Sequence, residues 1–457
     1  MDTKALRQKI LDLAIHGKLV PQDPNDEPAS VLLERIRAEK ERLIKEGKIK
    51  KGKKSAKTSD KPHYPYELPE GWAWCKLDDI AYVASGSTPE KSSFVPKGIP
   101  YIKMYNLRNQ KIDFEYKPQY ITAEIHNGKL QRSRTEVGDL IMNIVGPPLG
   151  KLAIIPPSLP QANFNQAAVL IRPYLHKDNI NVYLKAYLEE MSEINSISTK
   201  GSAGQVNISL TQSQNMRIPL PPLPEIERII KNLKYWLSFV DNIEENKEKL
   251  QDSIRQVKSK VLDLAIHGKL VPQDPNDEPA IELLKRINPK AEITCDTPQY
   301  GKLPKGWCLC RISSVVDIVN GKSQKNVESP TGKYPIYGSG GIIGKAMEYT
   351  CLAGSTIIGR KGTINHPIFV EENFWNVDTA FGMKANNQIL EDKYFYCFCL
   401  YFDFSKLDKS SALPSLTKTA IGNLILPIPP LAEQQRIVAR IEELFAQLDK
   451  IESSLQA

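Results

Sequence analysis

The segment Leu11–Ala29, LDLAIHGKLVPQDPNDEPA, occurs a second time without a change at Leu262–Ala280. Chance does not produce an identity of this length, so the chain contains two copies of one module. The segments that lie between the matched pieces differ in length and sequence. A repeat of this kind predicts units that share a buried face with their neighbours.

Two more pairs of short segments match between the copies. Leu68–Trp72 resembles Leu303–Trp307, and Ile218–Leu223 resembles Leu426–Leu431. When the alignments are extended to the chain ends, only about two residues are missing between the last residue of one copy and the first residue of the other. We therefore expect a pseudo-twofold circular repeat, with the C-terminus lying beside the N-terminus.

Apolar residues follow a helical stripe with 3–4 spacing from Leu223 to about His267. The stripe has a local break near Ile243, where Lys247 takes the next expected apolar position. An uninterrupted stripe occupies residues 431–457. The pattern predicts two long antiparallel coiled-coil helices that act as a spacer. The alternative is that they are core helices of a bundle.

The repeated segments 21–29 and 272–280 hold several prolines, which remove hydrogen-bond donors and favour extended backbone, so we expect turn-rich corners. His16 and His267 precede a glycine where each helix should end, which suits a helix C-terminus. The alternative is a catalytic loop, whose acidic residues would be Asp23, Asp26 and Glu27.

The two differing regions are rich in Val, Ile and Tyr and are interrupted by Gly and Pro, which predicts a mixed α/β (α+β) fold with short strands. Examples of such strands lie in Asp139–Gly146 and Gly354–Gly362. The chain then divides into an N-terminal helix, corner and basic linker, a first mixed domain, a central helix and corner, a second mixed domain and a C-terminal helix, at residues 1–67, 68–222, 223–300, 301–430 and 431–457.

Both mixed domains carry polar, basic loops whose Arg, Lys, Asn and Gln side chains are suited to base edges in the major groove. The candidate DNA-binding residues are Lys103, Asn106, Arg108, Lys200, Gln205, Asn207, Tyr337, Ser339, Arg360, Lys361, Thr363 and Lys418. Each loop taken alone also fits a solvated turn. The lysine-rich segment Gly47–Lys61 could add salt-dependent affinity for DNA or be a linker.

The composition, with 41% hydrophobic and 25% charged residues, indicates a globular protein, and the net charge of +8 only mildly favours an acidic partner. No run approaches the roughly 18 apolar residues that span a membrane, and the polar N-terminus is unlike a signal peptide, so we expect a cytoplasmic protein.

No catalytic or metal-binding motif is evident. Gly338–Lys345 fails as a phosphate loop, because Ser339 replaces the first glycine and Ala346 replaces the Ser or Thr that holds magnesium. The seven cysteines include the pairs Cys308/Cys310 and Cys397/Cys399, whose spacing suits one face of a strand. Neither pair is a metal knuckle, so we expect buried reduced thiols.

The combination of these motifs resembles the specificity subunit of type I restriction-modification enzymes over nearly the whole chain. The segments that carry the resemblance are the repeat itself, Gly71–Asp79, Ile218–Arg228, Leu426–Arg436, Tyr334–Gly344, Ile358–Asn365 and Phe374–Ala380. The resemblance implies two target-recognition domains, each reading one half of a bipartite site on double-stranded DNA, with the paired helices fixing the spacer between the halves.

The same resemblance implies partners. Two methyltransferase subunits would dock along the helices, and restriction subunits that translocate DNA would join them. S-adenosylmethionine, ATP and Mg²⁺ would be bound by those partners, with no cofactor in this chain. Because the two recognition regions differ, the target should be asymmetric.

Two other classes of function stay open. One is a structural adaptor whose mixed domains bind protein or glycan, and its binding should depend little on salt between about 50 and 200 mM, unlike DNA binding. The other is a DNA methyltransferase or nuclease, which would need a cofactor or metal site that the sequence does not show.

Overall fold

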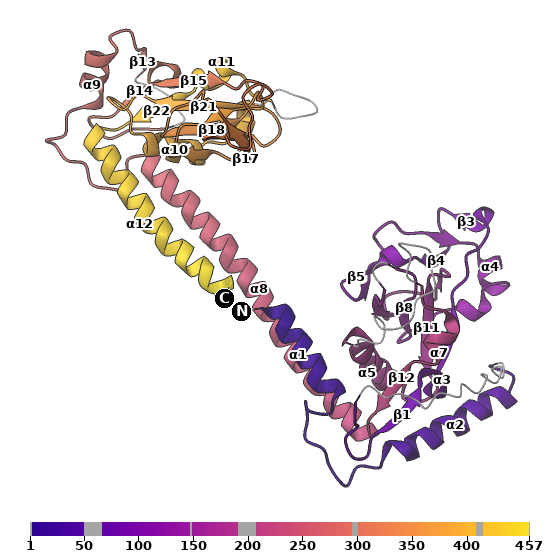
Figure 1. Ribbon diagram of the computed structural model, residues 1–457. Helices are drawn as coiled ribbons and strands as arrows, with labels where there is room; N and C mark the ends of the chain where they lie inside the picture. Colours follow the sequence, from indigo (N-terminus) through magenta and orange to yellow (C-terminus); the bar gives the residue numbers. More distant parts are fainter. Residues whose placement is uncertain are drawn as a thin grey trace. The chain divides into compact units, whose positions relative to one another are not determined.

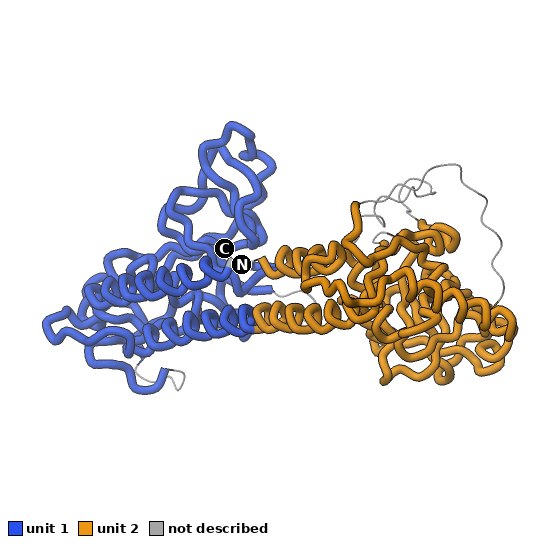
Figure 2. The backbone as a smooth tube through the Cα atoms, turned by 90° about the horizontal axis from the view of Figure 1, so that it is seen from below, with its two compact units in different colours: residues 1, 246–457 blue, residues 2–245 orange. Residues whose placement is uncertain are grey.

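The structure is a computed structural model that describes residues 2–49, 66–146, 149–190, 207–294, 300–407 and 415–456. It divides into two compact units, Asp2–Glu245 and Asn246–Ala457, which Figure 2 draws in orange and blue. We call them the N-terminal unit and the C-terminal unit. The boundary falls inside one helix, α8 (Leu223–Ile266), whose start and end agree with the predicted stripe.

The N-terminal unit begins with two helices joined by the proline-rich corner and continues into short strands (Figure 1). Its α-helices before α8 are α1 (Thr3–Ile15), α2 (Ala29–Lys45), α3 (Leu77–Ile80), α4 (Ala123–Asn127), α5 (Lys177–Glu190) and α7 (Leu210–Gln214). Its 3-10 helices are η1 (Lys91–Ser93), η2 (Met104–Asn106) and η3 (Gln131–Ser133). Its strands are β1 (Ala73–Lys76), β2 (Ala81–Ser85), β3 (Phe94–Val95), β4 (Ile99–Ile102), β5 (Leu107–Arg108), β6 (Lys111–Ile112), β7 (Tyr120–Ile121), β8 (Leu140–Asn143), β9 (Leu152–Ile154), β10 (Asn163–Phe164), β11 (Ala168–Pro173) and β12 (Arg217–Leu220).

The C-terminal unit is also built from helices and short strands. After α8 its helices are α9 (Ala280–Ile287), η4 (Ile312–Ser314), α10 (Asp392–Tyr401), η5 (Phe404–Leu407), α11 (Lys418–Gly422) and α12 (Leu431–Gln456). Its strands are β13 (Ile293–Thr294), β14 (Cys308–Arg311), β15 (Val316–Asn320), β16 (Tyr334–Gly338), β17 (Gly341–Ala346), β18 (Ser355–Gly359), β19 (Ile368–Val370), β20 (Trp375–Asn376), β21 (Ala380–Ala385) and β22 (Ile425–Ile428). Short strands mixed with helices confirm the mixed helix-and-strand character of the predicted fold.

The sheets of the two units follow one plan. The largest antiparallel sheet has the order β2-β11-β8-β9 in the N-terminal unit and β15-β21-β18-β19 in the C-terminal unit. A second sheet in each unit contains one parallel pair, β4 with β10 and β16 with β20. A third pairing, β1 with β12 and β14 with β22, joins the strand after the Gly-Trp motif to the strand before the long helix.

Two antiparallel helices pack together in each unit. In the N-terminal unit, Arg7 of α1 forms an ion pair with Asp241 of α8 at 2.5 Å, and in the C-terminal unit Lys258 of α8 pairs with Asp449 of α12 at 2.5 Å. The apolar stripe of α8 is buried near both of its ends, at residues such as Ile226 and Ile266. Burial of the stripe is uneven between the ends, because Leu250 is 40% exposed and Val257 is 46% exposed, whereas Ile254 is only 3% exposed.

Both copies of the repeat end their helix in the predicted way. His16 is the C-terminal cap of α1, and its Nδ1 lies 2.8 Å from the carbonyl oxygen of Asp12. His267 Nδ1 lies at the same distance from the Asp263 carbonyl oxygen. The glycine that follows each histidine has a positive φ of 66° or 65°, which residues other than glycine rarely adopt. The capping interpretation is confirmed.

The corner of each copy is tied to the start of the following long helix. Trp72 Nε1 donates to Glu225 Oε2 at 2.9 Å, and Trp307 Nε1 donates to Glu433 Oε2 at 3.1 Å. These four side chains are buried. An ion pair of 2.6 Å lies beside each of them, and the two pairs are Arg228–Asp26 and Arg436–Asp277. Asp26 and Asp277 of the corners are therefore structural partners of the helix.

One prediction about the cysteines is wrong. Cys308 and Cys310 lie buried on β14, as expected, but Cys397 and Cys399 lie on α10 and not on a strand. The aromatic residues around them favour strands by propensity, yet Glu391 caps a helix here by accepting a hydrogen bond from the Tyr394 amide. Both thiols are buried because α10 is covered on several sides.

Candidate nucleic-acid interface

Two of the predicted loops of the C-terminal unit lie together at the carboxyl ends of β16 and β18. A Cβ atom on Gly359 would lie 3.1 Å from Ser339 Cβ and would overlap the carbonyl of Thr363. The absence of a side chain at Gly359 thus lets the β16–β17 turn approach the loop at residues 360–363. The structure brings together residues that the sequence placed far apart.

A third predicted segment joins this cluster. The Leu416 amide donates to the Arg360 carbonyl at 2.9 Å, and Lys361 forms an antiparallel bridge with Ser415. Lys418 follows as the first residue of α11, where Thr417 caps the helix, and it lines a pocket of about 390 Å³ with residues such as Asp317. We call the turns at residues 337–341, 360–363 and 415–416 the loop cluster of the C-terminal unit.

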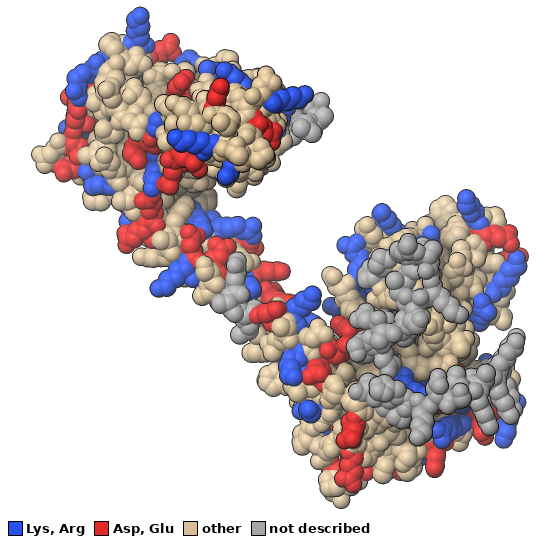
Figure 3. All heavy atoms as spheres, viewed as in Figure 1, with Lys and Arg blue, Asp and Glu red and all other residues tan. Residues whose placement is uncertain are grey.

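The loop cluster exposes cationic side chains. Lys361 and Lys418 are exposed, and the half-buried Arg360 guanidinium lies 6.0 Å from the centre of the Phe381 ring. Tyr337 packs edge-on against Phe374 instead, and partial burial raises the pKa of its hydroxyl. Lys and Arg are interspersed with Asp and Glu over the face of each unit that Figure 3 shows, so the described residues form no broad basic surface on that face.

The N-terminal unit holds the equivalent loops by the same backbone hydrogen bonds. The Val377 amide donates to the Tyr337 carbonyl at 3.0 Å, and the Asn165 amide donates to the Ile102 carbonyl at 3.1 Å. The Ile208 amide donates to the Ile144 carbonyl at 2.9 Å, as Leu416 does to Arg360. The loop frame is therefore the same in both units.

The side chains on the equivalent loops differ. Ile144 and Val145 take the positions of Arg360 and Lys361, because Val145 forms the bridge with Asn207 that Lys361 forms with Ser415. Ile144 is buried at 6% exposure. This loop of the N-terminal unit therefore lacks the two cations that its counterpart carries.

The predicted residues after β4 divide into one bracing residue and two cations. Asn106 is only 1% exposed, and its amide group donates to the carbonyls of Asp113 and Tyr116 while its oxygen accepts from the Lys103 amide. It is therefore a bracing residue of the loop in this structure. Arg108 is exposed and stacks 4.1 Å over the ring of Tyr116, and Lys103 lies 5.6 Å from the Phe94 ring centre.

Asn207 lies in the position that corresponds to Ser415, and its side-chain oxygen is buried without a hydrogen-bond partner. Lys200 and Gln205 lie outside the described residues, as does most of the lysine-rich segment Gly47–Lys61. Their predicted role in DNA binding stays a prediction.

The sequence reading missed one pair of residues that shapes both sites. Gly86 and Gly321 follow β2 and β15, and a Cβ atom on either would overlap the backbone of Asn165 or Val377. The amides of the next residues, Ser87 and Lys322, donate to the carbonyls of Phe164 and Asn376, which are the last residues of β10 and β20. A glycine directly after a strand was the only signal in the sequence.

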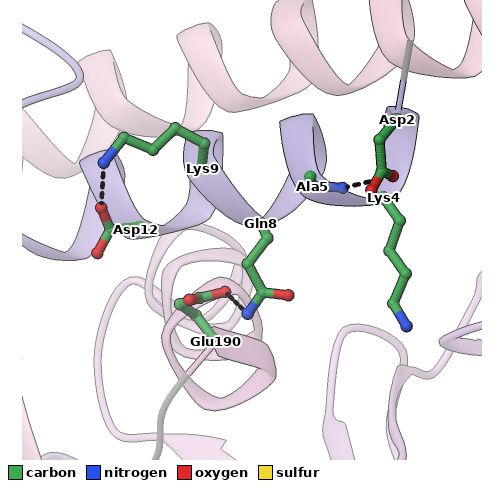
Figure 4. Close-up of a pocket in the computed structure, with 7 residues that line it drawn as sticks. All are labelled: Asp2, Lys4, Ala5, Gln8, Lys9, Asp12 and Glu190. Carbon is green, nitrogen blue, oxygen red and sulfur yellow. Dashed lines mark hydrogen bonds and ion pairs between the residues drawn. The ribbon is translucent and has the colours of Figure 1, made fainter. Parts of the chain in front are cut away.

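The described residues line several hollows. One of about 550 Å³ lies between α1 and α5, where Gln8 Nε2 donates to Glu190 Oε2 at 2.8 Å and Lys9 pairs with Asp12 (Figure 4). It contains no nucleophile with a base beside it. Among the described residues, no group of three His, Cys, Asp or Glu side chains could hold a metal ion. No described helix has the length and apolar content needed to cross a membrane.

The matched units agree with a known family. The family model for the type I restriction modification DNA specificity domain matches residues 69–252 and 304–457, which is once for each recognition region. The chain belongs to this family. The two matches begin at the Gly-Trp motifs and extend through the long helices, so they include the loops described above in both units.

Characterised relatives cover nearly the whole chain. The EcoAI specificity subunit of Escherichia coli is 27% identical over 98% of this chain and 90% of its own length, and the EcoEI specificity subunit is 28% identical over 99% and 91%. A solved chain from a study of complex assembly and conformational transition in a type I restriction-modification system has 18% identity and a TM-score of 0.57, covering 86% of this chain and 94% of that one. That similarity supports the fold.

The chain is a DNA sequence-specificity subunit of the type I class and is not the catalytic subunit. The resemblance seen in the sequence is confirmed.

Proposed function

We propose that each unit reads one half of a bipartite, asymmetric target on double-stranded DNA. The C-terminal unit would use its loop cluster, and the N-terminal unit would use the equivalent loops. In the C-terminal unit the contacting residues would be Ser339, Arg360, Lys361 and Thr363, with Lys418 beside them. In the N-terminal unit they would be Lys103, Arg108 and the chain near Asn207. Arg and Lys recognise guanine edges and phosphates, which suits exposed cations on short loops.

One observation carries this proposal. The two units hold their loops with matching backbone hydrogen bonds, yet Arg360 and Lys361 of one correspond to Ile144 and Val145 of the other. A frame that is repeated with different side chains is what reading two different half-sites requires. Two identical units would read a symmetric site instead.

The proposal assigns the long helices to spacing and assembly. As a straight helix, the 44 residues of α8 extend about 66 Å. Together with α1 and α12 it would form the antiparallel coiled-coil spacer of a circular repeat and set the number of unread base pairs. Two methyltransferase subunits would dock along these helices, and restriction subunits that translocate DNA would join them.

The chemistry would lie in those partners, which would bind S-adenosylmethionine, ATP and Mg²⁺. The chain itself would bind no cofactor. Because the target is cellular DNA, we expect the complex in the cytoplasm.

Methylation sequencing tests the proposal. DNA from cells that express this chain with its methyltransferase partner is compared with DNA from cells that lack only this chain. We expect adenine methylation at one split, asymmetric motif that disappears with the chain. Methylation that is unchanged by its loss would contradict the proposal and favour the structural adaptor. Binding of the full chain to a duplex with that motif should also weaken steeply between about 50 and 200 mM salt.

A further inference from the structure

The β16–β17 hairpin of the C-terminal unit exposes two large apolar side chains beside the loop cluster. Ile342 is 64% exposed and Ile343 is 55% exposed, although both belong to a strand. Adjacent residues of a strand normally point to opposite faces, so one of the two should be covered. This pair is an unexplained feature of the proposed DNA-reading surface.

A β-bulge explains how both side chains reach solvent. The register pairs Tyr337 with Ile342 but Ile336 with Gly344, so Ile343 is the extra residue of the bulge. Bulges re-aim side chains and concentrate near functional sites. The strand therefore turns two neighbouring isoleucines outward instead of one.

The tip of the hairpin is free, while the base of its turn lies against the cationic loop. A Cβ atom on Gly340 or Gly341 would meet nothing within 4 Å, so the tip stands free. Ser339, at the base of the turn, contacts Gly359, which directly precedes Arg360. Lys345 is also exposed on β17. Exposed apolar side chains flanked by cations are suited to DNA, which is a polyanion with apolar methyl groups in its major groove.

We propose that the β16–β17 hairpin enters the major groove of the second half-site and that Ile342 and Ile343 contact the C5-methyl groups of thymine. The major groove admits a two-stranded ribbon, and the thymine methyl is the one apolar group that a base pair presents there. Contact removes the isoleucine and methyl surfaces from water together, which gives a direct preference for A·T pairs. This inference rests on the proposed function and names a chemistry for one of its loops.

Among its described residues, the N-terminal unit shows no such tip. Its equivalent chain after β4 forms the β5–β6 hairpin, whose Gln110 side chain accepts a hydrogen bond from the Leu152 amide at 2.7 Å and is held against the core. The exposed groups there include Arg108, Lys111 and the partly exposed ring of Tyr116. The methyl-reading chemistry therefore belongs to one half-site only.

The test uses the full chain and duplexes that carry the motif found by methylation sequencing. In one duplex every thymine of the half-site assigned to the C-terminal unit is replaced by deoxyuridine, which removes only the methyl groups. In a control duplex the replacement is made in the other half-site. Affinity is measured for the wild-type chain, for Ile342→Ala/Ile343→Ala, and for Met347→Ala. Met347 is a matched control because it is 59% exposed just beyond the other end of β17.

We expect deoxyuridine in the C-terminal half-site to weaken wild-type binding about fourfold for each contacted methyl group. The double variant should bind the thymine duplex more weakly and show no difference between thymine and deoxyuridine. Met347→Ala should behave as the wild type, and thermal unfolding should confirm that the exposed substitutions leave the fold intact.

Two results would overturn the inference while leaving the proposed function in place. One is specific binding by the wild type that is equally strong with deoxyuridine. The other is a thymine preference that persists in the double variant. Equal binding of the wild type to duplexes with and without the motif would instead overturn the proposed function itself, and the inference with it.

Discussion

The two recognition units share a frame and differ in what the frame carries. In both, backbone amides and closely packed glycines hold the loops after corresponding strands. The C-terminal unit carries Arg360, Lys361 and a free apolar hairpin. The N-terminal unit has Ile144 and Val145 at the positions of Arg360 and Lys361. In this fold the backbone determines the position of the loops, and the side chains determine their chemistry.

The corners show the opposite behaviour. The repeated segments are identical in sequence, and the Trp–Glu hydrogen bonds and Arg–Asp ion pairs recur with nearly the same distances. Substitutions should therefore have different consequences in the loops of the two units and the same consequences in the corners.

The largest effect should come from making the two units alike. We expect a chain in which residues 301–430 are replaced by a second copy of residues 68–222 to direct methylation to a symmetric motif, because both units would read the same bases. The shared Gly-Trp and Pro-Pro-Leu segments provide matching junctions. Methylation sequencing measures the outcome. An asymmetric motif in this variant would contradict the expectation that two identical units read the same bases.

Removing the cations of one loop should have the next largest effect. We expect Arg360→Ala/Lys361→Ala to weaken specific DNA binding roughly 10- to 100-fold. The slope of the logarithm of the binding constant against the logarithm of the salt concentration should also become shallower by about one. Fluorescence anisotropy over a salt series measures both. The double variant Lys302→Ala/Lys305→Ala removes the same charge from exposed positions before β14 and should change affinity much less. Equal losses in the two variants would argue for nonspecific attraction.

The corners should respond alike. Glu225→Ala leaves Trp72 Nε1 buried without its acceptor, and Glu433→Ala does the same to Trp307. We expect each to lower the free energy of unfolding of its own unit by about 1–3 kcal/mol. Urea unfolding, followed with a probe in each unit, measures the two losses. A large difference between them would show that the corners are equivalent in geometry but not in energy.

The smallest effect should be a dependence on pH. Burial raises the pKa of both Glu225 and Glu433, so the folded chain binds these protons more tightly than the unfolded chain. The corresponding stability is present below about pH 4.5, the ordinary glutamate value, and is lost as the pH rises through the raised pKa. We expect Glu225→Gln and Glu433→Gln to gain stability relative to the wild type between pH 4.5 and 7, by less than the alanine variants lose. Urea unfolding of the wild type and of each variant at pH 4.5 and at pH 7 measures this gain. An equal difference in urea midpoint between variant and wild type at the two pH values would contradict it.

Local signals in the sequence predicted the helices and the corners well. The apolar stripe and the prolines fixed the limits of α8, and the histidine–glycine pairs marked helix ends. These features depend on residues close together in the chain. The mixed α/β class and the strands containing Leu140–Asn143 and Ser355–Gly359 followed from the same kind of pattern.

Features that depend on packing could not be predicted in this way. The helix at Cys397 and Cys399 is fixed by its cap and its burial, which outweigh the propensity of its aromatic residues. Asn106 has a side chain suited to adenine, yet the loop uses it internally. The exposure of Ile342 and Ile343 depends on a bulge, which no spacing in the sequence announces.

The partial success with the loop residues has the same cause. Their polarity was visible in the sequence, but the contact of Ser339 with Gly359 and the bridge of Lys361 to Ser415 join distant segments. The sequence could therefore nominate these residues without showing that they form one surface. The circular arrangement of the repeat stays a prediction.

The backbone-only bracing of the loops has a consequence for how such proteins change. The Tyr337 and Arg360 carbonyls hold their partners whatever side chains the two residues carry. Random libraries at the loop positions that are not glycine should thus retain a high fraction of folded members. Selection could then draw new DNA targets from a single ancestral scaffold, one half-site at a time.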